Sequence, residues 1–215
     1  MPSEPNHPRR PPFSAPPTSA LGRLERLPPA LLMLYFGLAA ITIMFAMLVA
    51  SYAYNRLAGS TVRGLHPFPR YFSLSTLVLL ASSYTVAQSR RLYLADDVAA
   101  LVRGLGATLL LACIFAGLQV LGWRELQQQG IFFSGEAGGT YVYLISALHV
   151  AHLLGGMLFL LVLLLRALAA ARDAVRGLVF IRDPYQLRQL RILSTYWHFV
   201  DVLWVALFAV FLFLY

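Results

Sequence analysis

The sequence predicts an all-α integral membrane protein, a bundle of five transmembrane helices with its N-terminus in the cytoplasm and its C-terminus outside. The 215-residue chain is 59% hydrophobic and only 12% charged, whereas about a quarter of the residues in a soluble domain are charged. Its mean hydropathy is +0.69. Five apolar segments are long enough to cross a bilayer, which takes about 20 helical residues. The 17 basic residues, all arginine, are distributed unequally among the connecting segments.

The five predicted spans form one transmembrane domain, residues 29–215, and lie at about 29–54, 71–88, 104–122, 141–165 and 192–215. The second, "YFSLSTLVLLASSYTVAQ", is short and rich in Ser and Thr. Such hydroxyls bond to carbonyls of their own helix or to a neighbouring helix, and small residues let helix backbones approach closely. We therefore expect this segment at a packed interior position rather than facing open lipid.

Residues 1–28 include the proline-rich text "PSEPNHPRRPPFSAPPTS" and lack apolar periodicity, which predicts a disordered cytoplasmic tail. The first apolar run starts far from the N-terminus and is too long for the apolar region of a signal peptide, so we expect it to remain as an anchor. Cys113, the single cysteine, is expected to be a small buried apolar residue.

The arginines predict the orientation of the bundle. Thirteen of them lie in the tail, in the loop between spans two and three, and in the loop between spans four and five, whereas the opposite side carries four. Because cytoplasmic loops are enriched in basic residues, the N-terminus is predicted inside and the C-terminus outside. The four on the opposite side are Arg56, Arg63, Arg70 and Arg124.

Ionisable residues inside the predicted spans are candidate functional residues, because they are costly in hydrocarbon. His149 and His152 share one face of the fourth span, and His198, Asp201 and Trp204 follow one another at a spacing of three in the fifth. We expect these two polar faces to meet. They form either a metal or bis-histidine haem site or a set of hydrogen-bonding groups between helices. At about 1.5 Å per residue, His152 lies roughly 20 Å and His198 about 9 Å from the cytoplasmic ends of their predicted helices, which disfavours haem ligation by this pair.

The site residues are predicted to serve helix packing, lipid contact or a subunit interface. Gly155 and Gly156 permit a close helix contact, and Trp197 is a packing or interfacial residue. The sequence contains no GxSxG motif and no phosphate-binding glycine loop. A stand-alone haem or copper membrane enzyme and a proton-coupled transporter remain as alternatives, although no inverted repeat is evident. The predicted set is His149, His152, Gly156, Trp197, His198, Asp201 and Trp204.

Two segments resemble a known family. "YWHFVDVLW" at 196–204 and "HVAHLLGGM" at 149–157 are similar to the C-terminal signature and the His-x-x-His region of subunit III of cytochrome c oxidase and related haem-copper oxidases. "LSTLVLLASSYT" at 74–85 resembles that family's Ser- and Thr-rich helix, and Gln119 and "GI" at 130–131 fall where the family has comparable residues. The resemblance extends from about Leu31 to the end of the chain.

The resemblance implies an accessory, non-redox subunit of a proton-pumping terminal oxidase in aerobic respiration, in the cytoplasmic (inner) membrane of a bacterium. Such a subunit carries no cofactor; haem and copper belong to the partners, subunit I and probably subunit II. It binds phospholipids, supports proton uptake, and can join a respiratory supercomplex. A subunit III-like component of a quinol oxidase or a nitric oxide reductase is the alternative within the same resemblance.

The sequence departs from the family pattern in two ways. Members of the family often have seven helices, and this chain resembles the later five. Many members carry a membrane-embedded glutamate in the first of those five helices, and Thr42 is aligned with it here. The resemblance therefore does not carry the role of that carboxylate over to this chain.

Overall fold

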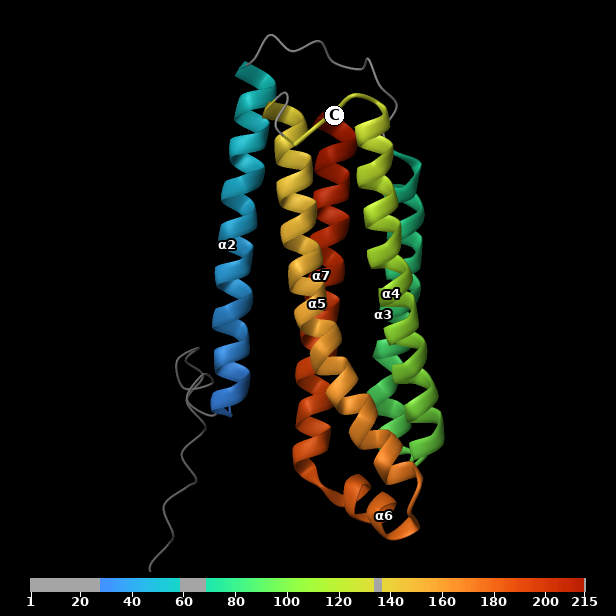
Figure 1. Cartoon of the computed structure of the whole chain (residues 1–215). Coiled ribbons are helices and arrows are strands. Elements are labelled where there is room, and N and C mark those ends of the chain that lie inside the picture. The colour runs from blue at the N-terminus through green and yellow to red at the C-terminus, as the bar shows by residue number, and fades with distance from the viewer. Residues whose placement is uncertain (1–27, 59–68, 134–136, 215) are drawn as a thin grey trace, which may run out of the picture.

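The computed structural model describes residues 28–58, 69–133 and 137–214, and the regular secondary structure of these residues is helical. Five long helices lie side by side and a short sixth helix, α6, crosses one end of the bundle (Figure 1). The described residues contain no strand, so the all-α prediction is confirmed. Residues 1–27 of the predicted tail lie outside the described residues. The helices are α2 (Pro29–Ala58), α3 (Arg70–Leu94), α4 (Val98–Gln128), α5 (Ala137–Ala171), α6 (Ala174–Arg182) and α7 (Pro184–Leu214).

The long helices alternate in direction along the chain (Figure 1). The start of α2, the turn between α3 and α4, and α6 all lie at one end of the bundle, and the C-terminal end of α7 lies at the other. The two arginine-rich connections, around residues 90–103 and 166–191, therefore share an end. Which side of a membrane that end faces remains a prediction.

Proline and aspartate residues fix the helix starts. Pro29 and Pro184 occupy first helical positions, where the missing N–H costs nothing and the fixed φ angle suits a helix. The Asp97 carboxylate accepts a backbone N–H of α4 at 2.8 Å, and the Asp173 carboxylate accepts one of α6 at 2.9 Å. These side chains satisfy donors that have no partner within the helix itself.

Four helices, α2, α4, α5 and α7, are long and apolar enough to cross a membrane. The fifth long helix, α3, has 25 residues but carries many Ser, Thr and charged residues, and it does not reach the same level of hydropathy. The described residues thus contain four helices that are long and apolar enough to cross a membrane, and a fifth span in α3 remains a prediction. Several helices also extend beyond the predicted spans, and the longest extension at a single end is that of α7, which begins at Pro184.

The outermost helix, α2, packs on α5 and α7 along a single seam. Its buried residues are Leu31, Leu38, Phe45 and Tyr52, and the repeat of seven places them on one face of the helix. The remaining surface of α2 is largely exposed and apolar. By contrast, α3 packs tightly against α4 and α7. The prediction of an interior position is wrong for its outer face, where Leu77 and Tyr84 are 65% and 70% exposed.

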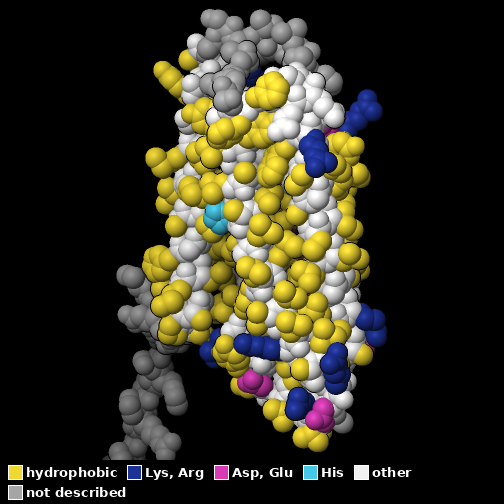
Figure 2. Space-filling model, viewed as in Figure 1, with side chains coloured by type: hydrophobic (Ala, Val, Ile, Leu, Met, Phe, Trp, Pro, Cys, Tyr) yellow, Lys and Arg dark blue, Asp and Glu magenta, His cyan; other side chains and the backbone are white. Residues whose placement is uncertain are grey.

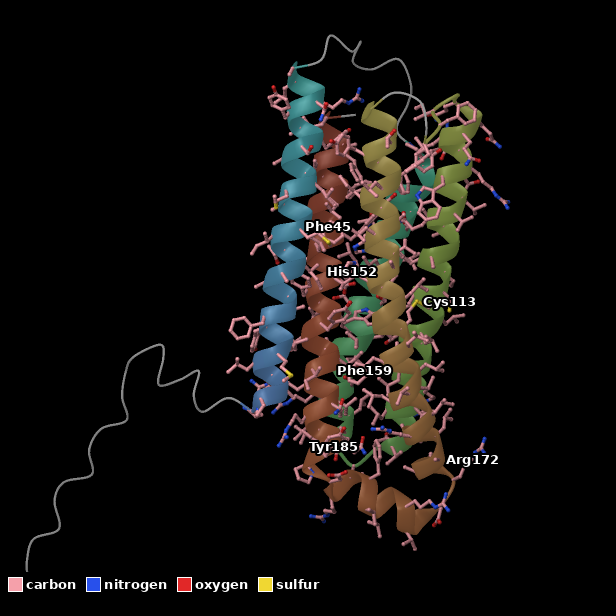
Figure 3. The ribbon with its side chains drawn as sticks, turned by 60° about the vertical axis from the view of Figure 1, so that its left-hand side comes forward. Phe45, Cys113, His152, Phe159, Arg172 and Tyr185 are labelled. Carbon is pink, nitrogen blue, oxygen red and sulfur yellow. The ribbon has the colours of Figure 1, made fainter. Side chains whose placement is uncertain are left out.

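On the face shown in Figure 2, hydrophobic side chains cover most of the surface, and the charged side chains gather near the two ends of the bundle. Cys113 belongs to this outer surface, because it is exposed on α4 (Figure 3). The expectation that Cys113 is buried was wrong. An apolar stretch of sequence does not distinguish the lipid-facing side of a membrane helix from its packed side, since both are apolar.

Candidate functional site: a buried polar face in the helix bundle

The polar row of α7 faces mainly α3. The indole N–H of Trp197 donates to the hydroxyl of Ser82 at 3.1 Å, and the indole N–H of Trp204 donates to the hydroxyl of Thr76 at 3.0 Å. Both tryptophans and both hydroxyl residues are buried. Each bond satisfies the only polar atom of a tryptophan side chain inside an apolar core. The two bonds therefore hold α7 in one register against α3.

The hydroxyls of α3 act as donors and acceptors at once. Ser75 and Thr76 both donate to the carbonyl oxygen of Phe72, at 2.9 and 2.8 Å. Ser75 also accepts a hydrogen bond of 2.9 Å from the side-chain amide of Gln119 on α4. A hydroxyl has one donor and two acceptor sites, and this arrangement uses both functions. The expectation that these hydroxyls bond back to helix carbonyls and across to neighbouring helices is confirmed.

His198 and Asp201 also face α3. The Nδ1 atom of His198 lies 2.8 Å from the Ser83 hydroxyl. That hydroxyl also lies near the Asp201 carboxyl, but neither oxygen of Asp201 makes a well-formed hydrogen bond with the described residues. Asp201 is almost completely buried. Ser83 is thus bonded to His198 and lies near Asp201 without a well-formed bond to it.

His149 lies at the centre of an aromatic cluster. Its ring centroid is 4.8 Å from that of Trp204 and 5.9 Å from that of Phe115, and the rings of Trp204 and Phe115 are perpendicular at 5.3 Å. The imidazole is fully buried, and neither of its nitrogens has a hydrogen-bond partner among the described residues. The polar faces of α5 and α7 thus meet through His149 and Trp204.

His152 has different neighbours, although it lies one turn from His149. Its Nδ1 atom lies 2.7 Å from the carbonyl oxygen of Leu148, which can only accept a hydrogen bond. Its ring packs edge to face on Phe45 of α2, with 5.7 Å between centroids (Figure 3). Thr42, the predicted position of the family carboxylate, donates to the Leu38 carbonyl of its own helix. The α2 residue against His152 is therefore Phe45, one turn further along the helix.

Gly156 allows the close contact between α5 and α7 that its sequence context predicts. A Cβ atom added there would lie 2.9 Å from a ring carbon of Tyr196 and 3.7 Å from the ring of Trp197. The Tyr196 hydroxyl donates to the carbonyl oxygen of His152 at 2.8 Å. Helices α5 and α7 therefore approach too closely for a side chain at position 156.

The predicted position of His198, about 9 Å from the cytoplasmic end of its helix, depends on a helix that starts near residue 192. Because α7 starts at Pro184, His198 lies about 21 Å along it rather than about 9 Å. The hydrogen bond from the Tyr196 hydroxyl to the His152 carbonyl oxygen also places residues 152 and 196 at similar heights in the bundle. The histidines nevertheless point to separate partners, because His198 is bonded to Ser83, His152 packs on Phe45 and His149 on Trp204.

Several polar residues of the bundle were not singled out by sequence reasoning. Thr85 of α3 is bonded to Thr108 of α4 at 2.8 Å, and the indole N–H of Trp123 donates to Ser146 of α5 at 2.9 Å. A usable signal exists on α3, where buried Ser, Thr and apolar residues recur at spacings of three and four. Within residues 28–58, 69–133 and 137–214, no three His, Cys, Asp or Glu side chains are grouped as metal ligands.

Four apolar helices of membrane-spanning length, with polar side chains bonded inside the bundle, define a polytopic integral membrane protein. The family model described as cytochrome c oxidase subunit III matches residues 33–215. The chain therefore belongs to the cytochrome c oxidase subunit III family.

Individual relatives agree with the family model. Cytochrome c oxidase subunit 3 of Bacillus sp. (strain PS3) is 30% identical over 172 residues, which cover 79% of this chain and 78% of the relative. The protein of the same name from Corynebacterium diphtheriae is 31% identical over 167 residues, covering 77% and 76%. That from Bacillus subtilis is 28% identical over 175 residues, covering 79% and 78%. The resemblance carried by "HVAHLLGGM" and "YWHFVDVLW" is thus confirmed.

Proposed function

We propose that this chain is the accessory, non-redox subunit of a proton-pumping haem-copper terminal oxidase in a bacterial cytoplasmic membrane. In this proposal it packs beside subunits I and II, which hold the haem and copper, and it has no cofactor of its own. The observation that carries the proposal is the use of the buried polar groups. Trp197, Trp204 and Gln119 direct their donors to hydroxyls of α3, so these groups join helices and are not arranged around a ligand.

We infer that α3 is the fifth membrane span. Its 25 residues measure about 38 Å as a helix, enough to cross a hydrocarbon core of about 30 Å. Its hydroxyls donate to carbonyls of the same helix, as in Ser82 to Leu79 and Ser89 to Val86, both at 2.7 Å. Satisfied polar groups cost much less in a bilayer than free ones. A five-span bundle agrees with a cytoplasmic N-terminus and an outside C-terminus.

Within this function, we assign structural roles to His198 and Asp201. Both lie where α7 packs on α3, and Ser83 is close to both. Asp201 alone would make a poor proton relay inside the subunit, because Thr42 stands where many members of the family carry a second carboxylate. The subunit would therefore support proton uptake by holding the catalytic subunit and its lipids in place.

Purification of the complex tests the function directly. A C-terminally tagged chain, extracted from its native membrane in mild detergent, should copurify at constant stoichiometry with a large subunit that contains haem and copper. After the subunits are separated, the tagged chain should carry neither haem nor copper. A Soret band or stoichiometric copper in the isolated chain would support a stand-alone enzyme instead. Copurification with a quinol oxidase or a nitric oxide reductase would change the identity of the complex.

A further inference from the structure

Two buried side chains at the centre of the bundle, His149 and Gln119, keep polar atoms that the described residues do not pair. His149 is 0% exposed, and neither of its ring nitrogens has a hydrogen-bond partner among those residues. Gln119 is also 0% exposed, and its amide oxygen, Oε1, has no partner among them either. Buried polar atoms are nearly always paired, with protein groups or with bound water, because an unpaired one is costly. These atoms therefore call for a partner.

The contacts between α4 and α5 place Gln119 opposite His149. Phe115 and Trp123 lie one turn before and one turn after Gln119 on α4. The ring of Phe115 packs on that of His149, with 5.9 Å between centroids, and the indole N–H of Trp123 donates to the Ser146 hydroxyl at 2.9 Å. Ser146 and His149 are one turn apart on α5, so the part of α5 that carries His149 faces the part of α4 that carries Gln119.

Helices α3 and α7 close the same site from the other side. The side-chain amide N–H of Gln119 donates to the Ser75 hydroxyl at 2.9 Å, and the indole N–H of Trp204 donates to the neighbouring Thr76 at 3.0 Å. The ring centroid of His149 lies 4.8 Å from that of Trp204. Gln119 and Trp204 thus end at adjacent residues of α3, and His149 packs on Trp204. Side chains from four helices therefore surround the unpaired atoms.

The unpaired atoms suit a small molecule that both donates and accepts hydrogen bonds. The amide oxygen of Gln119 accepts, whereas a neutral imidazole has one N–H donor and one acceptor nitrogen. The Ser75 hydroxyl donates to the Phe72 carbonyl and accepts from Gln119, which leaves it one further acceptor site. Complete burial limits the molecule to one that the bundle can enclose. Water has two donors and two acceptors, and it makes about three hydrogen bonds at a typical buried site.

We propose that one water molecule is bound between Gln119 and His149. It donates a hydrogen bond to the Gln119 amide oxygen and forms another with an imidazole nitrogen, and the free acceptor site of Ser75 is available for a third. This water joins α4 to α5, as the tryptophan N–H groups join α7 to α3. The inference goes beyond the proposed function and does not depend on it, because every contact that forms the site lies within this chain.

X-ray radiolysis of the full chain in lipid nanodiscs tests the proposal. X-rays convert water into hydroxyl radicals, which oxidise side chains beside a bound water even where bulk water has no access. Trp204 is 0% exposed, yet it should be oxidised in the wild-type chain. After rapid mixing into heavy-oxygen water, the isotope should appear at Trp204 later than at Tyr185, which is 47% exposed at the end of the bundle, because a buried water exchanges more slowly than bulk water.

The double variant Gln119→Met, His149→Phe replaces both polar side chains by apolar ones of similar size. An apolar site does not retain a water, so Trp204 oxidation should fall by roughly fivefold or more. The control variant Thr85→Val removes a hydroxyl that is already bonded to Thr108 at 2.8 Å, and Trp204 oxidation should stay unchanged in it. Far-ultraviolet circular dichroism confirms that each variant is folded.

Three results would overturn the proposal: no oxidation of Trp204 in the wild-type chain, simultaneous labelling of Trp204 and Tyr185, and undiminished oxidation in the folded double variant. The first would indicate a direct bond between His149 and Gln119, and the second entry of bulk water. A loss of Trp204 oxidation in Asp201→Leu alone would assign the water to that carboxyl and also contradict the proposal. Should the double variant fail to fold, Gln119→Met alone should still lower Trp204 oxidation, and an unchanged value would count against the site.

Discussion

Replacing Gly156 by alanine should push α5 and α7 apart. The added Cβ would lie 2.9 Å from one ring carbon of Tyr196 and 3.3 Å from the next, closer than carbon atoms pack. The ring cannot turn away freely, because its hydroxyl is bonded to the His152 carbonyl at 2.8 Å. Overpacking of this kind costs about 1–3 kcal/mol, and the better helix propensity of alanine offsets about 1 kcal/mol of that. We expect the free energy of unfolding of the Gly156→Ala variant to fall by about 1 kcal/mol.

Gly155→Ala is the matched control, because a Cβ at position 155 would have no heavy atom within 4 Å. It should be neutral or stabilise the fold by up to about 1 kcal/mol. Both variants should be unfolded by sodium dodecyl sulfate in mixed micelles and followed by far-ultraviolet circular dichroism. The difference in free energy of unfolding between the two alanine variants should be about 1–2 kcal/mol.

Tyr196→Phe adds a second check on the same contact. Without its hydroxyl the ring is released from the His152 carbonyl, so it can move away from the new methyl group. Gly156→Ala should therefore cost less in the Tyr196→Phe background, and the double-mutant cycle should give a coupling energy of at least 0.5 kcal/mol. Equal stability of the Gly155→Ala and Gly156→Ala variants, with additive effects in the cycle, would refute the close-contact explanation.

Three further predictions concern the bundle and its orientation. Thr76→Val should weaken the α3–α7 contact by about 0.6 kcal/mol and at most about 1.7 kcal/mol, measured by the same unfolding titration, and in the Trp204→Phe background it should have little additional effect. A reporter fused after Tyr215 should be found outside the cytoplasm and one inserted at Arg176 inside; the opposite pattern contradicts the five-span topology. Asp201→Asn should keep most of the oxygen consumption per assembled complex, and a near-total loss with normal subunit content would show that Asp201 carries protons.

The apolar helices could be predicted from sequence because a bilayer demands long apolar segments. The close packing of one face of α3 could also be predicted, since residues such as Ser75 and Ser82 are small and able to bond to their own helix. Its exposed face could not be foreseen, because the apolar residues that pack and those that face outward are alike in sequence. The short helix α6 was missed because nine residues give too little periodicity. A signal for the start of α7 was nevertheless available: Asp183 followed by Pro184 is a typical helix start, eight residues before the predicted span.

The partners of the polar residues could not be predicted. His149 and His152 lie three residues apart and share a face, yet one packs on Trp204 of α7 and the other on Phe45 of α2. Helical periodicity predicts the direction in which a side chain points from its own helix axis. It does not predict which neighbouring helix lies in that direction. For the same reason, the residue of α2 that meets His152 could not be predicted, because it depends on the crossing geometry of two helices. That residue is Phe45, one turn from Thr42.

The hydroxyls of α3 have a consequence for the order in which the chain is made. Thr76 and Trp204, which are bonded to each other at 3.0 Å, are 128 residues apart, so the ribosome releases α3 well before α7. In the interval Thr76 already donates to the carbonyl of Phe72 and Ser82 to that of Leu79, within the same helix. If α3 is the fifth span, as proposed, a nascent α3 would enter the bilayer with these hydroxyl protons already bonded, and α7 would later add donors to the free acceptor sites of the same hydroxyls. Synthesis of α7 would then complete the fold without a period in which these α3 hydroxyls lack an acceptor for their protons.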